Sequence, residues 1–505
     1  MSQSSAPASP QTDRFWWTWL ICITTVGFLI RAVNLFSQSF YYDEIVTAGL
    51  TRASFSALAS GVARDNGNPP LFWLLAKAAV TLFGDSETVL RGITVLAGTA
   101  ALPSFGLLGR RLFGVRAGLI AAALLALSPL SLEFSTEARV YPIVQLLAIT
   151  ATLCFILWLE YRRPLLLVPY VLLIVLGCWS HYYFAFIPIA HGLAVLATRD
   201  LRRCLHWLAS MLAAALLYSP WLPVFLRQVQ TPGNLARGGE RWLFQFLATP
   251  VAFTLGRSFA WRSDSHAALA FAVLAALLLF WLPASYALVR KNIIRGHAIL
   301  LGSWLILPVA VPLLVAILKA PLYNARYGAI AIPALLLLIA AFLDRVPTRY
   351  ALPTGALILL LCSASVIRFS YVPNKDDWNR ASAWLNPRLS PDGIVVVEPD
   401  EDAIAYLYHV RSLRQAPPDV VAVLPEATFQ EPLSGVLYHD GVRLEHVSTP
   451  HNAELYGHHR IWLLRLASAH SLQRYEDLFH QHSFKPVESV SLYGIELTEF
   501  RVTNP

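Results

Sequence analysis

Two adjacent carboxylates, Asp43 and Glu44 in "YYDE", follow the first strongly apolar run of the chain. A carboxylate that is half-shielded from water at a lipid boundary can accept a proton from an alcohol or hold a divalent cation. The same position also suits a helix cap, in which the carboxylate of Asp43 accepts backbone N–H bonds and Glu44 favours the helix dipole. Both interpretations stay open, because a cap would also fix a catalytic carboxylate in place.

A second acid and a cation, Glu137 and Arg139, lie in "STEARVYP" between two apolar runs. An acid near the first one, with a cation beside it, can position an acceptor and compensate an anionic leaving group. The alternative is an ion pair that only ends two helices. If a divalent cation takes part, Asp43 and Glu137 are its predicted ligands, but carboxylates can also work without a metal.

Three more polar residues stand beside apolar runs. Arg326 in "LYNARYGAIAIP" either anchors a late run to lipid headgroups or binds a lipid phosphate bidentately. His181 in "CWSHYYF" and Asn68 in "GNPPLF" are weaker candidates for substrate binding. An interfacial His and an Asn that opens a Pro-fixed turn are both common structural features.

The elements that must position these residues are membrane-spanning helices. The 505 residues are 56% hydrophobic and 14% charged, with a mean hydropathy of +0.53. A soluble protein of this size could not bury so much apolar surface, so the chain is an integral membrane protein. Runs long enough to cross about 30 Å of hydrocarbon start at about eleven places, near residues 15, 92, 117, 140, 165, 184, 206, 266, 297, 328 and 350.

Basic residues predict the orientation of these spans. With residue 1 in the cytoplasm, every inner turn carries Arg or Lys, as the positive-inside rule requires. These residues are Arg110, Arg111, Arg116, Arg162, Arg163, Arg199, Arg202, Arg203, Arg290, Lys291, Arg295, Arg345 and Arg349. The unusual polar residues then fall on the outer face, which we expect to carry the chemistry. Topology accounts for the basic excess, so no nucleic-acid partner is expected.

The chain divides into segments of different character. Residues 1–14 are predicted as a cytoplasmic tail, 15–370 as the membrane domain with the extracytoplasmic loop 37–91, and 371–505 as an extracytoplasmic α/β domain. Residues 371–505 carry 11 Lys+Arg against 18 Asp+Glu, and "GIVVVEPD" and "HHRIWLLRL" are predicted strands. Helical spacing occurs in 376–387, 401–411 and 470–481.

Two apolar stretches of the loop are predicted to lie on the outer surface. Residues 45–65 are expected to form one amphipathic helix on the membrane. Residues 68–84, which Lys77 interrupts, are expected to lie flat, because a further span there would invert every later loop and break the charge rule.

The chain resembles the bacterial family-39-like members of the GT-C glycosyltransferases, relatives of protein O-mannosyltransferases and of the aminoarabinose transferase of lipid A. The resemblance rests on "YYDEIVTAG", "GNPPLFWLL", "GRRLFGVRAGLIAAALLALSPLSLEFSTEARVYP", "ARYGAIAIPALLLL" and "KDDWNRASAWL". It implies an enzyme that transfers a sugar from a polyprenyl-phosphate carrier to an acceptor hydroxyl on the extracytoplasmic side of a bacterial plasma membrane. The acceptor is a lipid, a glycan or a protein, and one in-line displacement would invert the anomeric centre.

The resemblance also implies roles for matching residues. Asp43 maps onto the catalytic base with Glu44 as its neighbour, and Glu137 onto the acid of the second outer loop with Arg139 alongside. The late Arg-Tyr pair is Arg326 and Tyr327.

The sequence departs from the family at Asn68, where relatives usually have His or Lys before the Pro pair. A cation lost there leaves Arg139 or Arg326 with more of the carrier phosphate to hold.

Two other classes of protein remain open. A multi-span transporter or lipid flippase also has a few charges among many spans, but no repeat between halves is visible and the charges gather at one face. A non-catalytic scaffold would use the outer α/β domain to bind a cell-envelope partner. Loss of turnover on alanine substitution of Asp43 distinguishes the enzyme from the scaffold.

Overall fold

The computed structural model of the chain contains two compact units, which are described separately. The membrane unit comprises residues 1–35 and 62–372, and the C-terminal unit comprises residues 36–61 and 373–505. The residues that the structure describes are 10–33, 35, 39–64, 68–230, 242–257, 272–289, 294–318, 323–371, 375–390, 393–398, 403–412, 420–423, 443–446, 458–466, 477 and 479–502.

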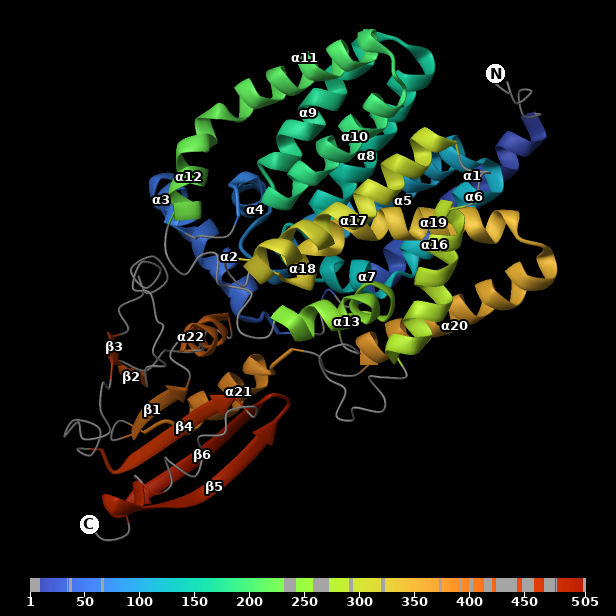
Figure 1. Cartoon of the computed structure of the whole chain (residues 1–505). Helices are drawn as coiled ribbons and strands as arrows, with labels where there is room; N and C mark the ends of the chain where they lie inside the picture. The colour runs from blue at the N-terminus through green and yellow to red at the C-terminus, as the bar shows by residue number, and fades with distance from the viewer. Residues whose placement is uncertain are drawn as a thin grey trace. The chain divides into compact units, whose positions relative to one another are not determined.

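The membrane unit is built from helices (Figure 1). The first half holds α1 (Pro10–Val33), α4 (Leu71–Phe83), α5 (Glu87–Phe113), α6 (Val115–Ala126), α7 (Pro129–Ser135), α8 (Tyr141–Tyr161), η1 (Pro164–Leu166), α9 (Leu167–Cys178), η2 (Tyr182–Ala185) and α10 (Phe186–Ala197). The second half holds α11 (Leu201–Tyr218), η3 (Ser219–Trp221), α12 (Leu222–Gln230), α13 (Trp242–Leu255), η5 (Leu277–Trp281), α16 (Leu282–Val289), α17 (Arg295–Leu318), α18 (Ala325–Gly328), η6 (Ala329–Ala331), α19 (Ile332–Arg345) and α20 (Thr348–Tyr371).

Helices of membrane-spanning length confirm the polytopic fold. Among the described residues, seven are long and apolar enough to cross a membrane: Asp13–Val33, Glu87–Phe113, Tyr141–Tyr161, Leu201–Gln230, Arg295–Leu318, Ala325–Arg345 and Thr348–Ser370. The bent pair α6 and α7 makes an eighth candidate. The remaining three predicted spans correspond to shorter apolar helices, Pro164–Cys178, Tyr182–Ala197 and Ala272–Ala287.

Two other apolar helices are short. Helix α4 has 13 residues and α13 has 14. At about 1.5 Å per residue each is only about 20 Å long, well below the thickness of the hydrocarbon layer. Their length therefore agrees with the prediction that the 68–84 stretch is not a full span, and its flat placement stays a prediction.

A buried arginine stabilises the bend between α6 and α7. The two helices meet at 56°, and Pro129 at the start of α7 has no amide hydrogen to donate to the carbonyl of Leu125. Arg31, fully buried at the end of α1, donates to the carbonyls of Leu125 and Ala126 at 3.3 Å each, and to Ser135 Oγ at 3.2 Å. Because backbone groups inside a membrane need internal partners, Arg31 allows the chain to bend here. This bend sets the direction of α7, which carries the candidate site.

The C-terminal unit contains a mixed six-stranded sheet with the order β3-β2-β1-β4-β6-β5 among the described residues (Figure 1). Its strands are β1 (Gly393–Glu398), β2 (Val420–Val423), β3 (Arg443–His446), β4 (Arg460–Leu466), β5 (Phe484–Leu492) and β6 (Ile495–Val502). Strands β3, β2, β1 and β4 are parallel, with Val395 opposite Trp462, and β6 joins β4 and β5 antiparallel. Helices α21 (Trp378–Leu385) and α22 (Ala403–Ser412) and the turn η7 (Asn386–Arg388) belong to the same C-terminal segment.

Burial explains the order of the strands. The central strands β1 and β4 are buried on both faces, so they appear in the sequence as continuous apolar runs. Strand β5 is exposed along most of its length and contains Lys485 and Pro486, which protect an edge strand from further pairing. The predicted strands in "GIVVVEPD" and "HHRIWLLRL" are thus β1 and β4, while most of the helix predicted over 470–481 lies outside the described residues.

The prediction of one continuous amphipathic helix over residues 45–65 is wrong. The chain forms two helices, α2 (Tyr42–Arg52) and α3 (Phe55–Arg64). Ala53 is extended at φ −61° and ψ 161°, and Ser54 Oγ accepts a hydrogen bond from the amide of Ala57 at 3.2 Å. A serine that caps a new helix overrides the apolar periodicity that continues through it.

Candidate active site

Two buried glutamates lie at the end of α7. Glu133 is in the helix and Glu137 is in the turn after it, where its amide donates to the carbonyl of Phe134 at 3.2 Å. Their exposed fractions are only 2% and 3%. Two carboxylates at this depth require cationic or hydrogen-bonding partners.

Arg257 is the first of these partners. Its backbone amide and its Nε donate to Glu133 Oε2 at 3.1 and 3.2 Å, and its Nη2 contacts Glu137 Oε1. The preceding residue, Gly256, has φ +87°, and a Cβ added there would lie 2.4 Å from Glu133 Oε1. A glycine is therefore required twice over, for the backbone conformation and for the close approach of the carboxylate.

Arg326 is the second partner. Its Nη2 donates to Glu137 Oε2 at 3.1 Å, and its guanidinium lies over the ring of Tyr141, 5.2 Å from the centroid. Asn324 caps α18 by accepting the amide of Arg326 at 2.9 Å, which fixes the start of the side chain. Arg326 therefore does more than anchor a span, because it shares Glu137 with Arg257.

We call Glu133, Glu137, Arg257 and Arg326 the carboxylate–guanidinium cluster. The glutamates are enclosed, whereas the side chains of Arg257 and Arg326 are 25% and 18% exposed. The acids thus hold the two guanidinium groups in place, while the arginine side chains that carry these groups remain partly accessible. Such a preorganised pair of cations suits a phosphate, whose oxygens guanidinium groups bind in a bidentate manner.

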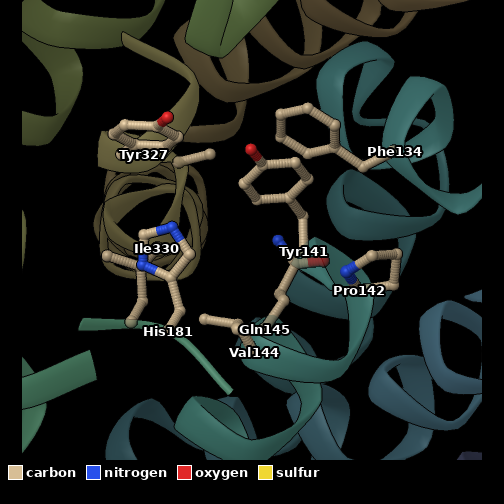
Figure 2. Close-up of a pocket in the computed structure, with 9 residues that line it drawn as sticks. Phe134, Tyr141, Pro142, Val144, Gln145, His181, Tyr327 and Ile330 are labelled. Atoms are coloured by element: carbon tan, nitrogen blue, oxygen red, sulfur yellow. The ribbon is translucent and has the colours of Figure 1, made fainter. Parts of the chain in front are cut away.

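A pocket lies beside the cluster (Figure 2). Its walls come from α7, the start of α8, the turn before η2, and α18 with η6: Phe134, Tyr141, Pro142, Val144, Gln145, His181, Tyr327, Ala329 and Ile330. Figure 2 shows the rings of His181 and Tyr327 opposite that of Tyr141. Arg326 is adjacent to Tyr327 in the chain and contacts Tyr141, so the pocket and the cluster share an edge.

The structure brings together most of the predicted residues of the membrane unit. Glu137 and Arg326 form an ion pair, Tyr327 and His181 line the pocket, and the charge of half-buried Arg139 acts on His181. Asn68 does not line the pocket. It is buried in a turn tied to the His181 segment by a hydrogen bond from the amide of Leu71 to the carbonyl of Trp179 at 3.0 Å.

The "YYDE" motif belongs to the C-terminal unit, where its two acids differ. Asp43 is half-buried at the second position of α2, so it is not the N-cap residue, which is Tyr41. Glu44 is fully buried, accepts the amide of Tyr41 at 3.4 Å, and pairs with Lys375 Nζ at 2.8 Å. Tyr41 thus occupies the N-cap position that was predicted for Asp43, and Glu44 accepts a hydrogen bond from the amide of this N-cap residue.

The contacts of Glu137 do not suit the divalent cation that was considered for this residue and Asp43. Both carboxylate oxygens of Glu137 contact guanidinium groups, Oε1 that of Arg257 and Oε2 that of Arg326. Within the described part of the chain, no group of three or more His, Cys, Asp or Glu could hold a metal ion.

Two members of the cluster, Glu133 and Arg257, were not predicted from the sequence. Glu133 precedes Glu137 by one helical turn inside an apolar stretch, a spacing that marks one face of a helix. Arg257 follows a glycine, yet it lies 120 residues from Glu137. No local pattern links positions so far apart.

The chain has the multi-span membrane fold that the resemblance implied. Residues 67–223 match the family model described as dolichyl-phosphate-mannose-protein mannosyltransferase. No curated protein matches the chain in sequence.

Solved structures of similar fold cover nearly the whole chain. ArnT from Cupriavidus metallidurans bound to undecaprenyl phosphate matches with a TM-score of 0.59 at 15% identity, over 95% of this chain and 98% of that one. The apo state of the same protein matches with a TM-score of 0.60 at 14% identity and with the same coverage. Archaeal oligosaccharyltransferase AglB from Archaeoglobus fulgidus, in complex with an inhibitory peptide and a dolichol-phosphate, gives 0.50 at 14% identity, over 97% of this chain and 74% of that one.

Proposed function

We propose that this protein is a glycosyltransferase that moves a sugar from a polyprenyl-phosphate carrier to an acceptor hydroxyl. The observation that carries the proposal is the carboxylate–guanidinium cluster, in which buried Glu133 and Glu137 pair with two partly exposed arginine side chains. Two structures of the same fold are of proteins bound to undecaprenyl phosphate or dolichol-phosphate. Both of these lipids carry a phosphate, and a phosphate is the group that this pair of cations suits.

The proposed reaction is a single displacement at the anomeric carbon. The acceptor oxygen forms the new glycosidic bond, the bond from the anomeric carbon to the phosphate oxygen breaks, and polyprenyl phosphate leaves. Arg257 and Arg326 compensate the negative charge that the phosphate gains as it leaves. Asp43 is the proposed base that takes the proton of the acceptor hydroxyl. In-line attack inverts the anomeric centre and transfers a hexose or pentose.

The proposed location of the reaction is the extracytoplasmic face of a bacterial plasma membrane. The support is the predicted orientation of the spans, in which the inner turns are basic. The cluster lies at the ends of spans, since Tyr141–Tyr161 begins four residues after Glu137 and Ala325–Arg345 begins one residue before Arg326. Charges at span ends favour chemistry on lipid headgroups over transport through the midplane, where a transporter would hold its substrate.

The test uses purified protein in detergent and a panel of radiolabelled polyprenyl-phosphate sugars, with released polyprenyl phosphate as the readout. Wild type should release it from one donor, and Asp43→Asn should lose about 10²- to 10⁴-fold of that rate without a change in melting temperature. Asp85→Asn, an exposed carboxylate of the same predicted loop, is the matched control and should keep the rate. No release from any donor would exclude the transferase and make transport the function to test. Equal release by wild type and Asp43→Asn would remove Asp43 as the base.

A further inference from the structure

His181 has a hydrogen-bonding arrangement that fixes which ring nitrogen carries its proton. Nδ1 accepts a hydrogen bond from the amide of Tyr183 at 3.1 Å, and a nitrogen that accepts cannot carry the proton. In the neutral ring the proton is therefore on Nε2. The backbone of the η2 turn thus selects the tautomer.

The Nε2–H group of His181 has no partner within the described structure. The residue is 4% exposed, and Nε2 is buried without a hydrogen-bond partner. A buried donor without an acceptor is rare and destabilises the fold, so its presence needs an explanation. Because His181 lines the pocket of Figure 2, a ligand oxygen there could supply the hydrogen-bond acceptor that the described residues do not provide.

The surroundings of His181 keep the ring neutral. Burial, and after it the charge of Arg139, lower the pKa of His181 to about 3. Its ring neighbours are Tyr141, Tyr183 and Tyr327, with centroids 6.0, 5.5 and 5.3 Å away. At neutral pH the group is therefore an uncharged donor between aromatic rings.

We propose that His181 binds the polyprenyl-phosphate sugar in the pocket that it forms with Tyr141 and Tyr327. In this complex Nε2–H donates a hydrogen bond to an oxygen of the lipid-linked sugar. This inference rests on the proposed function. The oxygen that accepts this hydrogen bond belongs either to the carrier phosphate or to the sugar. Both groups offer the same chemistry, an oxygen lone pair beside the guanidinium of Arg326. Binding would thus give Nε2–H the hydrogen-bond acceptor that it lacks among the described residues.

Two substitutions separate binding from a purely structural role. His181→Asn keeps an oxygen that can accept the Tyr183 amide, as a capping Asn does, but places no donor at the position of Nε2. His181→Gln places an amide N–H near the position of Nε2 but gives up the short capping geometry. A binding role predicts that His181→Asn weakens ligand binding more than His181→Gln does. A structural role predicts that His181→Gln lowers the stability of the fold more than His181→Asn does.

The experiment measures dissociation constants of polyprenyl phosphate and of the polyprenyl-phosphate sugar, by thermal shift titration in detergent, for wild type and both variants. We expect His181→Asn to bind the sugar donor about 5- to 100-fold more weakly with an unchanged or higher melting temperature without ligand, and His181→Gln to stay within about threefold. A loss shared by both ligands assigns the oxygen to the phosphate, and a loss confined to the sugar donor assigns it to the sugar.

Two results overturn the inference, and they differ. If wild type binds the donor and His181→Asn binds it equally well, His181 is only a cap and the proposed function stands. If wild type binds neither ligand, the proposed function fails and this inference fails with it.

Discussion

The two units each bury a glutamate from an acidic motif, and they satisfy it differently. In the C-terminal unit, Glu44 is fully buried and pairs with Lys375, whose side chain is 8% exposed. In the membrane unit, Glu137 is shared between Arg257 and Arg326, whose side chains are 25% and 18% exposed. The first pair is closed to solvent on both sides, whereas the second is enclosed only on the side of the acid.

This difference separates a stabilising pair from a binding site. A closed pair of one acid and one ammonium has little capacity left for a ligand, and its role is to hold α2 against the start of the C-terminal segment. Guanidinium groups carry five donors each, so Arg257 and Arg326 can keep Glu137 and still bind phosphate oxygens. The comparison favours a structural role for Glu44 and a binding role for the cluster.

The largest effect is expected from breaking the closed pair. Lys375→Met leaves the carboxylate of Glu44 buried without its cation, which should destabilise the fold by about 3–5 kcal/mol. The double variant Glu44→Gln/Lys375→Met removes both charges and should recover most of this loss. The melting temperature of the purified protein in detergent measures both changes.

The control for this prediction is an exposed pair of the same unit. Arg380 pairs with Asp377 at 3.4 Å, but its side chain is 79% exposed. Arg380→Met should therefore change stability by less than about 1 kcal/mol. An unchanged melting temperature in Lys375→Met would show that Glu44 does not depend on Lys375, and the contrast between the two units would fail.

The same comparison shows what the sequence can and cannot predict. The long apolar helices, β1 and β4 were predictable because apolar runs are local signals, although three of the eleven predicted spans correspond to helices shorter than a full span. The motifs "YYDE" and "STEAR" stood out as charges among apolar residues. The partners of these acids were not predictable, since Lys375 lies 331 residues from Glu44 and Arg257 lies 120 from Glu137. The sequence shows which charges are unusual, and only the fold shows which of them are neutralised.

The next effect tests whether the open cluster binds a phosphate. Arg326→Met removes one of two cations, and the affinity for polyprenyl phosphate should fall about 10- to 100-fold, the range for a hydrogen bond to a charged group. Arg326→Lys keeps the charge but loses the bidentate geometry. Its affinity for polyprenyl phosphate should therefore lie between those of Arg326→Met and wild type. If the affinity stays the same in both variants, the cluster is as structural as the Glu44–Lys375 pair.

A smaller effect should come from the glycine that lets Arg257 reach the acids. Gly256→Ala places a methyl group 2.4 Å from Glu133 Oε1 at φ +87°, and should cost about 1–2 kcal/mol from the backbone conformation alone. Gly114→Ala is the matched control, because Gly114 has φ +104° and nothing within 4 Å of the added Cβ. Gly114→Ala should show the loss of thermal stability that the backbone conformation causes, and Gly256→Ala should lose more because its methyl group also meets Glu133. Only Gly256→Ala should also lose turnover. Equal turnover in the two would mean that the position of Arg257 does not matter to the reaction.

The smallest effect concerns the dependence of thermal stability on pH. We expect His181 to make the membrane unit less stable in acid. Burial lowers the pKa of His181 from 6.5 to about 3 in the folded protein, so the unfolded chain binds a proton that the folded one does not. The stability that comes from a neutral His181 is therefore complete above about pH 6.5 and is lost as the pH falls towards 3. Between pH 7.5 and 5.5 the loss should be about 1 kcal/mol. It should appear as a difference between the melting temperatures of wild type and His181→Asn that changes with pH. The corresponding difference between wild type and Arg380→Met should stay constant over this range, because both of these proteins keep His181. A wild-type curve parallel to that of His181→Asn would mean that His181 is accessible to protons, and the membrane-unit site would then be open on the side of the histidine as well as on the side of the two arginines.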